Sequence, residues 1–409
     1  MNDFPPGRAA ALARLAAIRP DRYARSRNYL AGAVTRLSPY LRHGIIDLAE
    51  VRDAVLVLDR PRRDIEKFVQ ELGWRDYWRR VYGIIGQRIW ENVEPYKTGV
   101  ADYAEALPPD IESGTTGLAC MNGFVRDLVD GGYVHNHARM YFASYVVHHR
   151  RIRWQAGARF YLRYLLDGDP ASNNLSWQWV ASTFGFKPYI FNRENLERYT
   201  EGMYCRTCPL ATAGCPFEAS YETLDAKLFP NNASDESAGK IDLMVPADAP
   251  ARAAKTDGAI VWIHPDALND TGVARRAAPH APTIVAGVNE MHERDAWSDA
   301  RRAFVDGSLR DMRVDERASG DAVDAIVAFA RASKATTVIT TASPDPLLQA
   351  SIARIRKQVP VLAIEPPAFA SLDRAVNLGR FSRYWRRAEV SAFERTQVST
   401  DPNLRVSSD

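Results

Sequence analysis

Polar and aromatic side chains are concentrated in one stretch of this sequence, residues 133–184. The stretch contains two carboxylates, Asp167 and Asp169, together with Arg139, several amides and three tryptophans. A buried amide or carboxylate without a partner costs about 1–3 kcal/mol or more, so these groups need polar contacts. Their density predicts a planar, polar ligand bound among these side chains.

Four cysteines form a second candidate site. Cys205, Cys208 and Cys215 follow the pattern C-x2-C-x6-C, and Cys120 stands far upstream. In a cytosolic chain this spacing indicates metal binding rather than disulfides. Four thiolates suit either a structural zinc or a [4Fe–4S] cluster, and the spacing does not distinguish them. Unrelated buried thiols are the alternative interpretation.

A basic segment overlaps the first stretch and contains no acidic residue. Between Arg139 and Arg163 it includes Arg150, Arg151, Arg153 and Arg159, with His148 and His149. Basic side chains interleaved with Trp and Tyr suit a polyanion that carries stackable bases. A solvated helix face explains the same pattern equally well.

Composition excludes several classes of protein. The chain has 409 residues, of which 46% are hydrophobic, as in globular proteins of two or more domains. Its net charge of +3 does not by itself indicate a nucleic-acid partner. No apolar run reaches the roughly 18 residues of a membrane span, and the N-terminus lacks a signal-peptide core. We therefore expect a cytoplasmic protein without a membrane partner.

The sequence pattern changes along the chain. Residues 1–230 are predicted to be helical, because apolar residues recur there at three- and four-residue spacing. Residues 231–256, rich in Pro, Ala, Ser, Asp and Gly, predict a linker. In residues 257–370 short β-branched runs alternate with helical segments, which predicts a doubly wound parallel sheet. A helical tail is expected over residues 371–409.

Five motifs stand in a set order in the helical part. They are TRLSPYLRHG at 35–44, QELGWRDYW at 70–78, TGLACM at 116–121, HNHARM at 135–140 and DGDPASNNLSWQW at 167–179. Together they resemble the flavin-binding domain of the photolyase and cryptochrome family. The later AIVWIHPDALNDTG resembles the start of that family's N-terminal α/β domain. The resemblance implies an all-helical FAD-binding domain followed, as in a circular permutation, by the α/β domain.

The resemblance implies a bound FAD and assigns residues to it. Thr35 to Ser38 match the turn that holds the diphosphate. Asp167 and Asp169 match the pair at the ribose and ring edge, Arg139 matches the partner of the first carboxylate, and Asn173 matches the residue that faces N5. Each of these, taken singly, is also explained by a helix cap or a turn. The assigned set is Tyr23, Thr35, Arg36, Leu37, Ser38, Arg75, Asn136, Arg139, Asp167, Asp169 and Asn173.

The resemblance also implies a pocket for a cyclobutane pyrimidine dimer, which needs an aromatic wall, a carboxyl, an amide and an apolar contact. The matching residues are Glu71, Trp74, Asn136, Met140 and Trp179. We expect such a dimer to be flipped out of UV-damaged DNA.

An electron path to the flavin is implied as well. Trp177 matches the first electron donor and Trp154 the next. Trp177 and Trp179 lie about 200° apart on a helix, so they serve different surfaces. The last link is not assigned, and its candidates are Trp90, Tyr96 and Tyr103.

The cysteines resemble those of the bacterial iron–sulfur branch, which implies a [4Fe–4S] cluster at Cys120, Cys205, Cys208 and Cys215. Characterised members of that branch repair (6–4) photoproducts, with paired histidines where this chain has His135-Asn136. The pocket residues touch the substrate, so we give them more weight than the cluster.

The expected function is therefore that of a deoxyribodipyrimidine photo-lyase. A (6–4) photolyase, with His135 or His137 as the acid, and a cryptochrome-like photoreceptor are the alternatives. No residue is assigned to an antenna chromophore, and a monomer is the default expectation. We interpret His148 and His149 as DNA-facing residues or a helix end.

Overall fold

The chain forms two compact units that interleave along the sequence, whereas the predicted domains follow one another. Residues 35–87 group with the α/β part of the chain, which the sequence pattern does not reveal. The computed structural model describes residues 3–58, 60–212, 214–230, 241–248 and 256–396. The first unit comprises residues 1–3, 21–34 and 88–243, and the second comprises residues 4–20, 35–87 and 244–409.

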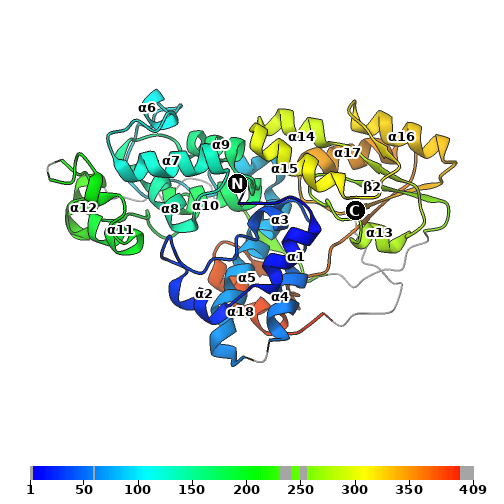
Figure 1. Cartoon of the computed structure of the whole chain (residues 1–409), viewed down its shortest axis with the longest axis horizontal. Helices are drawn as coiled ribbons and strands as arrows, with labels where there is room; N and C mark the ends of the chain where they lie inside the picture. Colours follow the sequence, from blue (N-terminus) through cyan, green and yellow to red (C-terminus); the bar gives the residue numbers. More distant parts are fainter. Residues whose placement is uncertain (1–2, 59, 213, 231–240, 249–255, 397–409) are drawn as a thin grey trace. The chain divides into compact units, whose positions relative to one another are not determined.

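The first unit is built from helices (Figure 1). Helices α8, α9 and α10 pack against one another, and Trp154, Tyr141, Tyr161 and Phe142 are fully buried there. The elements are α6 (Pro109–Glu112), α7 (Ala119–Gly131), α8 (Asn136–Ser144), the π-helical turn η2 (Tyr145–His149), α9 (Trp154–Tyr164), α10 (Pro170–Ala181), α11 (Arg193–Thr200), the 3-10 turn η3 (Cys205–Thr207) and α12 (Tyr221–Leu228), while α2 (Pro20–Ser26) and η1 (Gly86–Trp90) lead into the unit.

The second unit contains a five-stranded parallel sheet in the order β4-β3-β2-β5-β6, which confirms the predicted doubly wound fold. Its strands are β2 (Ala259–Ile263), β3 (Thr283–Val285), β4 (Glu316–Arg317), β5 (Thr337–Thr341) and β6 (Val361–Ile364). Strand β2 is buried along its whole length, as its run of apolar residues predicts. The connecting helices are α13 (Val273–Ala277), α14 (Val288–Asp295), α15 (Asp299–Arg310), α16 (Ala322–Ala332) and α17 (Pro346–Arg356).

Further helices complete the second unit. The long helix α5 packs against α18 near the C-terminus (Figure 1). A short antiparallel pair, β1 and β7, begins inside the predicted linker, whose residues 231–240 and 249–255 lie outside the described residues. These elements are α1 (Arg8–Ala16), α3 (Ser38–Arg42), α4 (Leu48–Leu56), α5 (Arg62–Ile85), β1 (Met244–Val245), β7 (Val376–Asn377) and α18 (Phe381–Ala392).

A buried ion pair joins α3 to the loop after β2. Arg42 contacts Asp266, and their side chains are 2% and 6% exposed. Asp266 also accepts a hydrogen bond of 2.6 Å from Ser343 Oγ. Burial opposes the charged form of Asp266, but Arg42, His264 and Ser343 together hold its pKa below the usual value. This contribution to stability is present above the unfolded pKa of Asp266 and is lost as the pH falls toward the folded value.

Gly44 allows this close contact. Its φ of +59° lies in the left-handed region, and a Cβ there would lie 2.3 Å from the backbone oxygen of Asp266. Glycine thus ends the predicted helix of the TRLSPYLRHG motif and lets the chain lie against the sheet.

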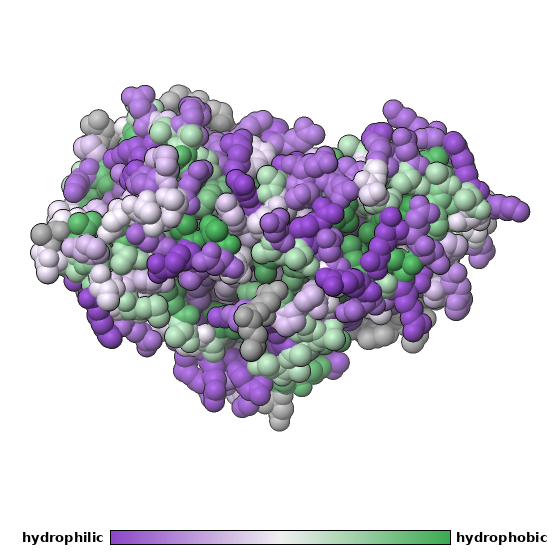
Figure 2. Space-filling model, turned by 45° about the horizontal axis from the view of Figure 1, so that its top comes forward, coloured by the Kyte–Doolittle hydropathy of each residue, from purple (hydrophilic) through white to green (hydrophobic). Residues whose placement is uncertain are grey.

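The surface carries no broad apolar band on the face shown in Figure 2, where hydrophilic and hydrophobic residues are interspersed. Within the described residues, no helix combines the length and apolar character that crossing a membrane requires.

Replacing one member of the buried ion pair tests its energetic role. We expect Arg42→Met to lower the free energy of unfolding by about 3–5 kcal/mol, because it leaves the carboxylate of Asp266 buried without its cation. Urea denaturation followed by circular dichroism measures this loss. Arg354→Met is the matched control, since Arg354 and Asp321 form an exposed pair whose loss costs about 1 kcal/mol at most. Equal losses in the two variants would contradict the assigned role.

Candidate functional site

An ion pair between Arg139 and Asp167 lies within the 133–184 stretch. Arg139 Nη2 donates to both carboxylate oxygens of Asp167, at 3.0 and 2.9 Å, and Arg139 Nε donates to the Val134 carbonyl at 2.7 Å. Burial alone lowers the pKa of Arg139, but Asp167 and the nearby Tyr133 raise it above its usual value. The predicted pairing is therefore present, and it fixes α8 against the segment before α10.

Asp169 and Asn173 lie on the first turn of α10. Asp169 caps the helix, accepting hydrogen bonds from Ala171 N and Ser172 Oγ, both at 3.1 Å. Asn173 Nδ2 donates to the Ala158 carbonyl and to Asn174 Oδ1, both at 3.0 Å. Asn173 Oδ1 receives no donor from the described residues, so it remains free to accept an N–H group.

Trp177 lies deep between α9 and α10. Its side chain is 3% exposed and meets Tyr161 edge to face, with ring centroids 5.3 Å apart. A Cβ at Gly157 would lie 2.2 Å from Trp177 Cη2, so only glycine admits the indole there. Trp179 is half-buried beside Tyr189, with ring centroids 5.5 Å apart. The two tryptophans therefore have different surroundings, as their spacing predicts.

A second aromatic contact lies at the start of α9. Trp154 is fully buried and lies parallel to Trp90, with ring centroids 6.3 Å apart. Trp154 Nε1 donates to Asn92 Oδ1 at 2.7 Å, and the guanidinium of Arg159 lies 4.6 Å from the Trp90 ring. Among the three candidates for the last link, Trp90 is the one whose ring stacks on Trp154.

Tyr96 and Tyr103, the other two candidates, stack on each other with centroids 4.5 Å apart. Burial raises the pKa of both phenols.

Two of the predicted lesion contacts meet on α8. Asn136 Nδ2 lies 3.7 Å from Met140 Sδ, one helical turn away, and Asn136 is exposed to solvent. His135, which precedes them, is buried and accepts a hydrogen bond from the His137 backbone N–H at 3.2 Å.

Two further predicted lesion contacts, Glu71 and Trp74, belong to α5 in the second unit. Glu71 pairs with Lys67 at 2.8 Å. Trp74 stacks on Phe381 of α18, with ring centroids 3.8 Å apart and planes 8° from parallel. Phe381 thus covers one face of the Trp74 ring.

The predicted diphosphate turn also lies in the second unit. Arg36 has a φ of +54°, and Leu37 N donates to Thr35 Oγ1 at 3.4 Å. The hydroxyl of Ser38 has no partner among the described residues, so it remains available to an anion. Tyr23 lies on α2, in a segment of the first unit.

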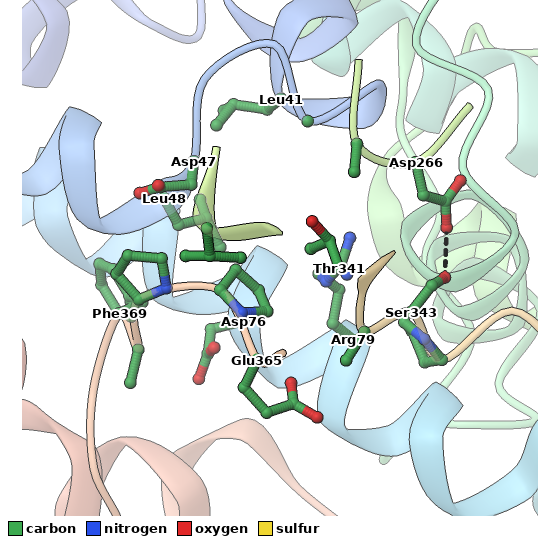
Figure 3. A pocket seen from close by; sticks show the side chains of 18 of the residues that line it. Leu41, Asp47, Leu48, Asp76, Arg79, Asp266, Thr341, Ser343, Glu365 and Phe369 are labelled. Carbon is green, nitrogen blue, oxygen red and sulfur yellow. Dashed lines mark hydrogen bonds between the residues drawn. The ribbon is translucent and has the colours of Figure 1, made fainter. Parts of the chain in front are cut away.

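A cavity of about 560 Å³ opens at the carboxyl ends of β2, β5 and β6, within the second unit (Figure 3). Arg79 reaches from α5 toward Thr341, and Ser343 bonds to Asp266 at its wall. Arg79 forms no ion pair with any described residue. Arg75, predicted to bind the cofactor, also lines this cavity.

Chain direction explains where the cavity lies. Strands β2 and β5 run side by side. The connection after β2 leads to β3 on one side of this pair, and the connection after β5 leads to β6 on the other side. Such a switch point is where α/β sheets bind ligands. Sequence reasoning missed this cavity, although the polar residues after β2 and β5 were a usable signal.

The four cysteines line one small cavity in the first unit, together with Arg193, Tyr204 and apolar residues. Burial, together with the proximity of the other three thiols, raises the pKa of Cys120 to about 12. The spacing argument thus correctly grouped residues far apart in sequence. Among the described residues, however, no group of three or more His, Cys, Asp or Glu side chains is arranged to hold a metal ion.

The basic segment is less exposed than its sequence indicates. His148 is fully buried, with Nε2 2.9 Å from the Val180 carbonyl, and burial lowers its pKa to about 3. The interpretation of His148 as a DNA-facing residue is therefore wrong, although η2 does end at His149. Arg150 pairs with Asp110 at 2.7 Å, and Arg153 pairs with Glu105 at 2.9 Å.

Comparison with known proteins gives one family match. Residues 68–203 match the family described as the FAD binding domain of DNA photolyase. A deoxyribodipyrimidine photo-lyase of Streptomyces griseus is 36% identical over 155 residues, which cover 38% of this chain and 33% of the relative. One from Alkalihalophilus pseudofirmus is 32% identical over 179 residues, covering 42% of this chain and 37% of the relative.

A solved structure, the class III photolyase of Agrobacterium tumefaciens, is 25% identical, with a TM-score of 0.43, over 57% of this chain and 54% of its own. The chain spans only 33% to 42% of the length of the first three curated relatives that it matches.

The contact between Gly157 and Trp177 can be tested directly. We expect Gly157→Ala to lower the free energy of unfolding by about 1–3 kcal/mol and to change the near-ultraviolet circular dichroism of Trp177, because the added methyl group overlaps the indole. Gly131→Ala, at the end of α7, has no atom within 4 Å of its new methyl group and should be neutral or slightly stabilising. An unchanged spectrum in Gly157→Ala would show that Trp177 is held differently.

Proposed function

We propose that this chain, whose residues 68–203 match the FAD binding domain of DNA photolyase, is a deoxyribodipyrimidine photo-lyase. It would act as a cytoplasmic monomer and split cyclobutane pyrimidine dimers in UV-damaged DNA. The observation that carries the proposal is the convergence of the Arg139–Asp167 pair, the free Oδ1 of Asn173 and the buried Trp177 on helices α8 to α10. These are the groups that a flavin ring edge and its electron donor need.

The residues present fit FAD. Asn173 offers an unused acceptor to an N–H of the ring, while Asp167, held by Arg139, and Asp169 offer carboxylate oxygens to hydroxyl and N–H groups. Ser38 offers a free hydroxyl for the diphosphate. We assign the remaining contacts to Tyr23, Thr35, Arg36, Leu37, Arg75 and Asn136. When FAD is bound and reduced, its photoexcited state would supply the electron that opens the dimer.

The protein's own part in keeping the cofactor reduced is an aromatic path. Trp177 packs against Gly157, one helical turn from Trp154, and Trp154 stacks on Trp90. We propose Trp90 as the outer end of this path, because its side chain is partly exposed to solvent.

On the substrate side, Trp179 and Met140 supply aromatic and apolar surface, and Asn136 and Glu71 supply hydrogen-bonding groups. The remaining assigned contact is Trp74, whose ring Phe381 covers on one face. An extruded dimer is a suitable ligand for such a set, because its bases are already poorly stacked in the duplex.

A second candidate function is favoured by the grouped cysteines. We propose that Cys120, Cys205, Cys208 and Cys215 hold a [4Fe–4S] cluster, supported by the single cavity that all four line. Metal binding would deprotonate these thiols, although burial raises the pKa values of Cys120, Cys205 and Cys215. A cluster at this place favours the (6–4) lesion, with His135 or His137 as the acid. A cryptochrome-like photoreceptor would use the same FAD-binding groups without repair.

We further propose that the cavity in the second unit receives the light-harvesting chromophore. Its size, its position at the switch point of the sheet and the guanidinium of Arg79 at its wall suit a planar anionic ligand.

A repair assay tests the proposed function. The purified, reduced chain is illuminated with an oligonucleotide that carries one thymine dimer, and intact thymine is followed by chromatography. We expect light-dependent recovery in the wild type. Trp179→Ala should bind the lesion about 5- to 100-fold more weakly, since stacking on an aromatic ring is worth about 1–3 kcal/mol per base. The same assay with an oligonucleotide that carries a (6–4) photoproduct shows which lesion is repaired. Binding of both oligonucleotides without repair of either would support a photoreceptor.

Iron analysis tests the cysteine assignment. We expect the wild-type chain, purified without oxygen, to contain about four iron atoms, and Cys208→Ala to lose them, since three thiolates hold such a cluster poorly. Met203→Ala is the control, because Met203 is exposed on the same segment. Equal iron content in wild type and Cys208→Ala, or zinc in place of iron, would overturn the cluster.

A further inference from the structure

We propose that Phe381 is a gate on the stacking face of Trp74, occupying in the free protein the place that an unpaired base takes in the nucleic-acid complex. The inference rests on the proposed function only for the identity of the base. Its physical basis is a contact within the second unit, between the middle of α5 and the first residue of α18 (Figure 1).

The geometry of this contact is that of two stacked bases. The rings of Trp74 and Phe381 lie 3.8 Å apart and only 8° from parallel. The other rings next to Trp74 are inclined, at 82° for Tyr77 and 42° for Trp78. Phe381 is therefore the neighbour whose position and orientation a flat base stacked on Trp74 would take.

Phe381 stands at the N-terminal end of α18. It is the first residue of the helix and directly follows Arg380 at the N-cap position. Backbone N–H groups at such an end have no helical partner, so the first turn frays before the rest. Gly379 precedes this turn and gives the backbone rotational freedom.

The rest of α18 stays anchored when this turn opens. Tyr77 Oη donates to the Leu378 carbonyl at 2.7 Å on one side of Phe381, and Tyr384 Oη donates to Asp76 at 2.5 Å on the other. Trp385 packs directly on Gly73, where a Cβ would lie 2.4 Å from its ring. Release of Phe381 thus needs a local movement between two fixed points, not undocking of the helix.

Charge around the gate favours a polyanion. The exposed face of α18 carries Arg383 and Arg386. At the start of α5, the exposed Arg62 pairs with Glu389 at 3.1 Å, and Arg63 lies 3.9 Å from Asp64. Arginines around an aromatic stacking surface suit a single strand, whose phosphates need cations while its bases need flat partners. The predicted ligand is therefore a nucleic acid with an unpaired base.

Binding of fluorescent oligothymidylate to the full chain, measured by anisotropy, tests the gate. We expect Phe381→Ala to bind about tenfold more tightly than the wild type, because the base no longer competes with a phenyl ring. Phe381→Tyr should restore wild-type affinity. Trp74→Ala, combined with Phe381→Ala, should remove the gain. An abasic oligonucleotide of equal length should bind all these variants alike.

Val390→Ala is the matched control, since Val390 lies on the same helix, 73% exposed and away from Trp74. Thermal unfolding of every variant checks that α18 remains docked. Unchanged or weaker binding by a folded Phe381→Ala chain would overturn the gate, as would a gain that persists with abasic strands. Tighter binding without any repair would instead count against the proposed function and leave the gate intact.

Discussion

The buried ion pair between Arg139 and Asp167 is the interaction on which the candidate site depends. A carboxylate in this position is unfavourable unless a cation and hydrogen bonds compensate for lost solvation. Arg139 Nη2 donates to both carboxylate oxygens of Asp167, which supplies that compensation. The same contact fixes the segment that leads into α10. The first turn of α10 then places Asp169 and Asn173, and the third turn places Trp177 against Gly157. One charge pair thus sets the positions of Asp169, Asn173 and Trp177 together.

The second unit follows a different constraint. A parallel sheet buries both faces of its strands, so its polar chemistry is confined to the loops at the strand ends. The cavity at the carboxyl ends of β2, β5 and β6 is the result. Helices α3 and α5 complete its walls, and the buried contact of Arg42 with Asp266 holds α3 to the loop after β2. The same helix α5 presents Trp74 to Phe381, so a cavity wall and a stacking surface share one rigid element.

Local pattern predicted much of this structure from the sequence. Periodicity identified the long helix α5, and β-branched runs identified β2, β3, β5 and β6. The pairing of Arg139 with Asp167 and the grouping of four distant cysteines came from recognised motifs and spacing. The edge strand β4 was missed because its two residues, Glu316 and Arg317, are exposed and carry no apolar signal.

Long-range packing accounts for the remaining differences. The burial of His148 depends on its contact with α10, which its charged neighbours in sequence conceal. The stacking of Phe381 on Trp74 joins residues more than three hundred positions apart, and no local pattern reports such a contact. The interleaving of the two units arises in the same way, from packing between segments that are distant in sequence.

The most direct measurement of the central claim is a titration of the purified chain with FAD, followed by absorption spectroscopy after removal of free cofactor. The proposed arrangement predicts one FAD retained per chain, with the spectrum of a bound flavin, and a much weaker retention in Asp167→Asn. A wild-type chain that is folded, colourless and unable to retain added FAD would contradict it.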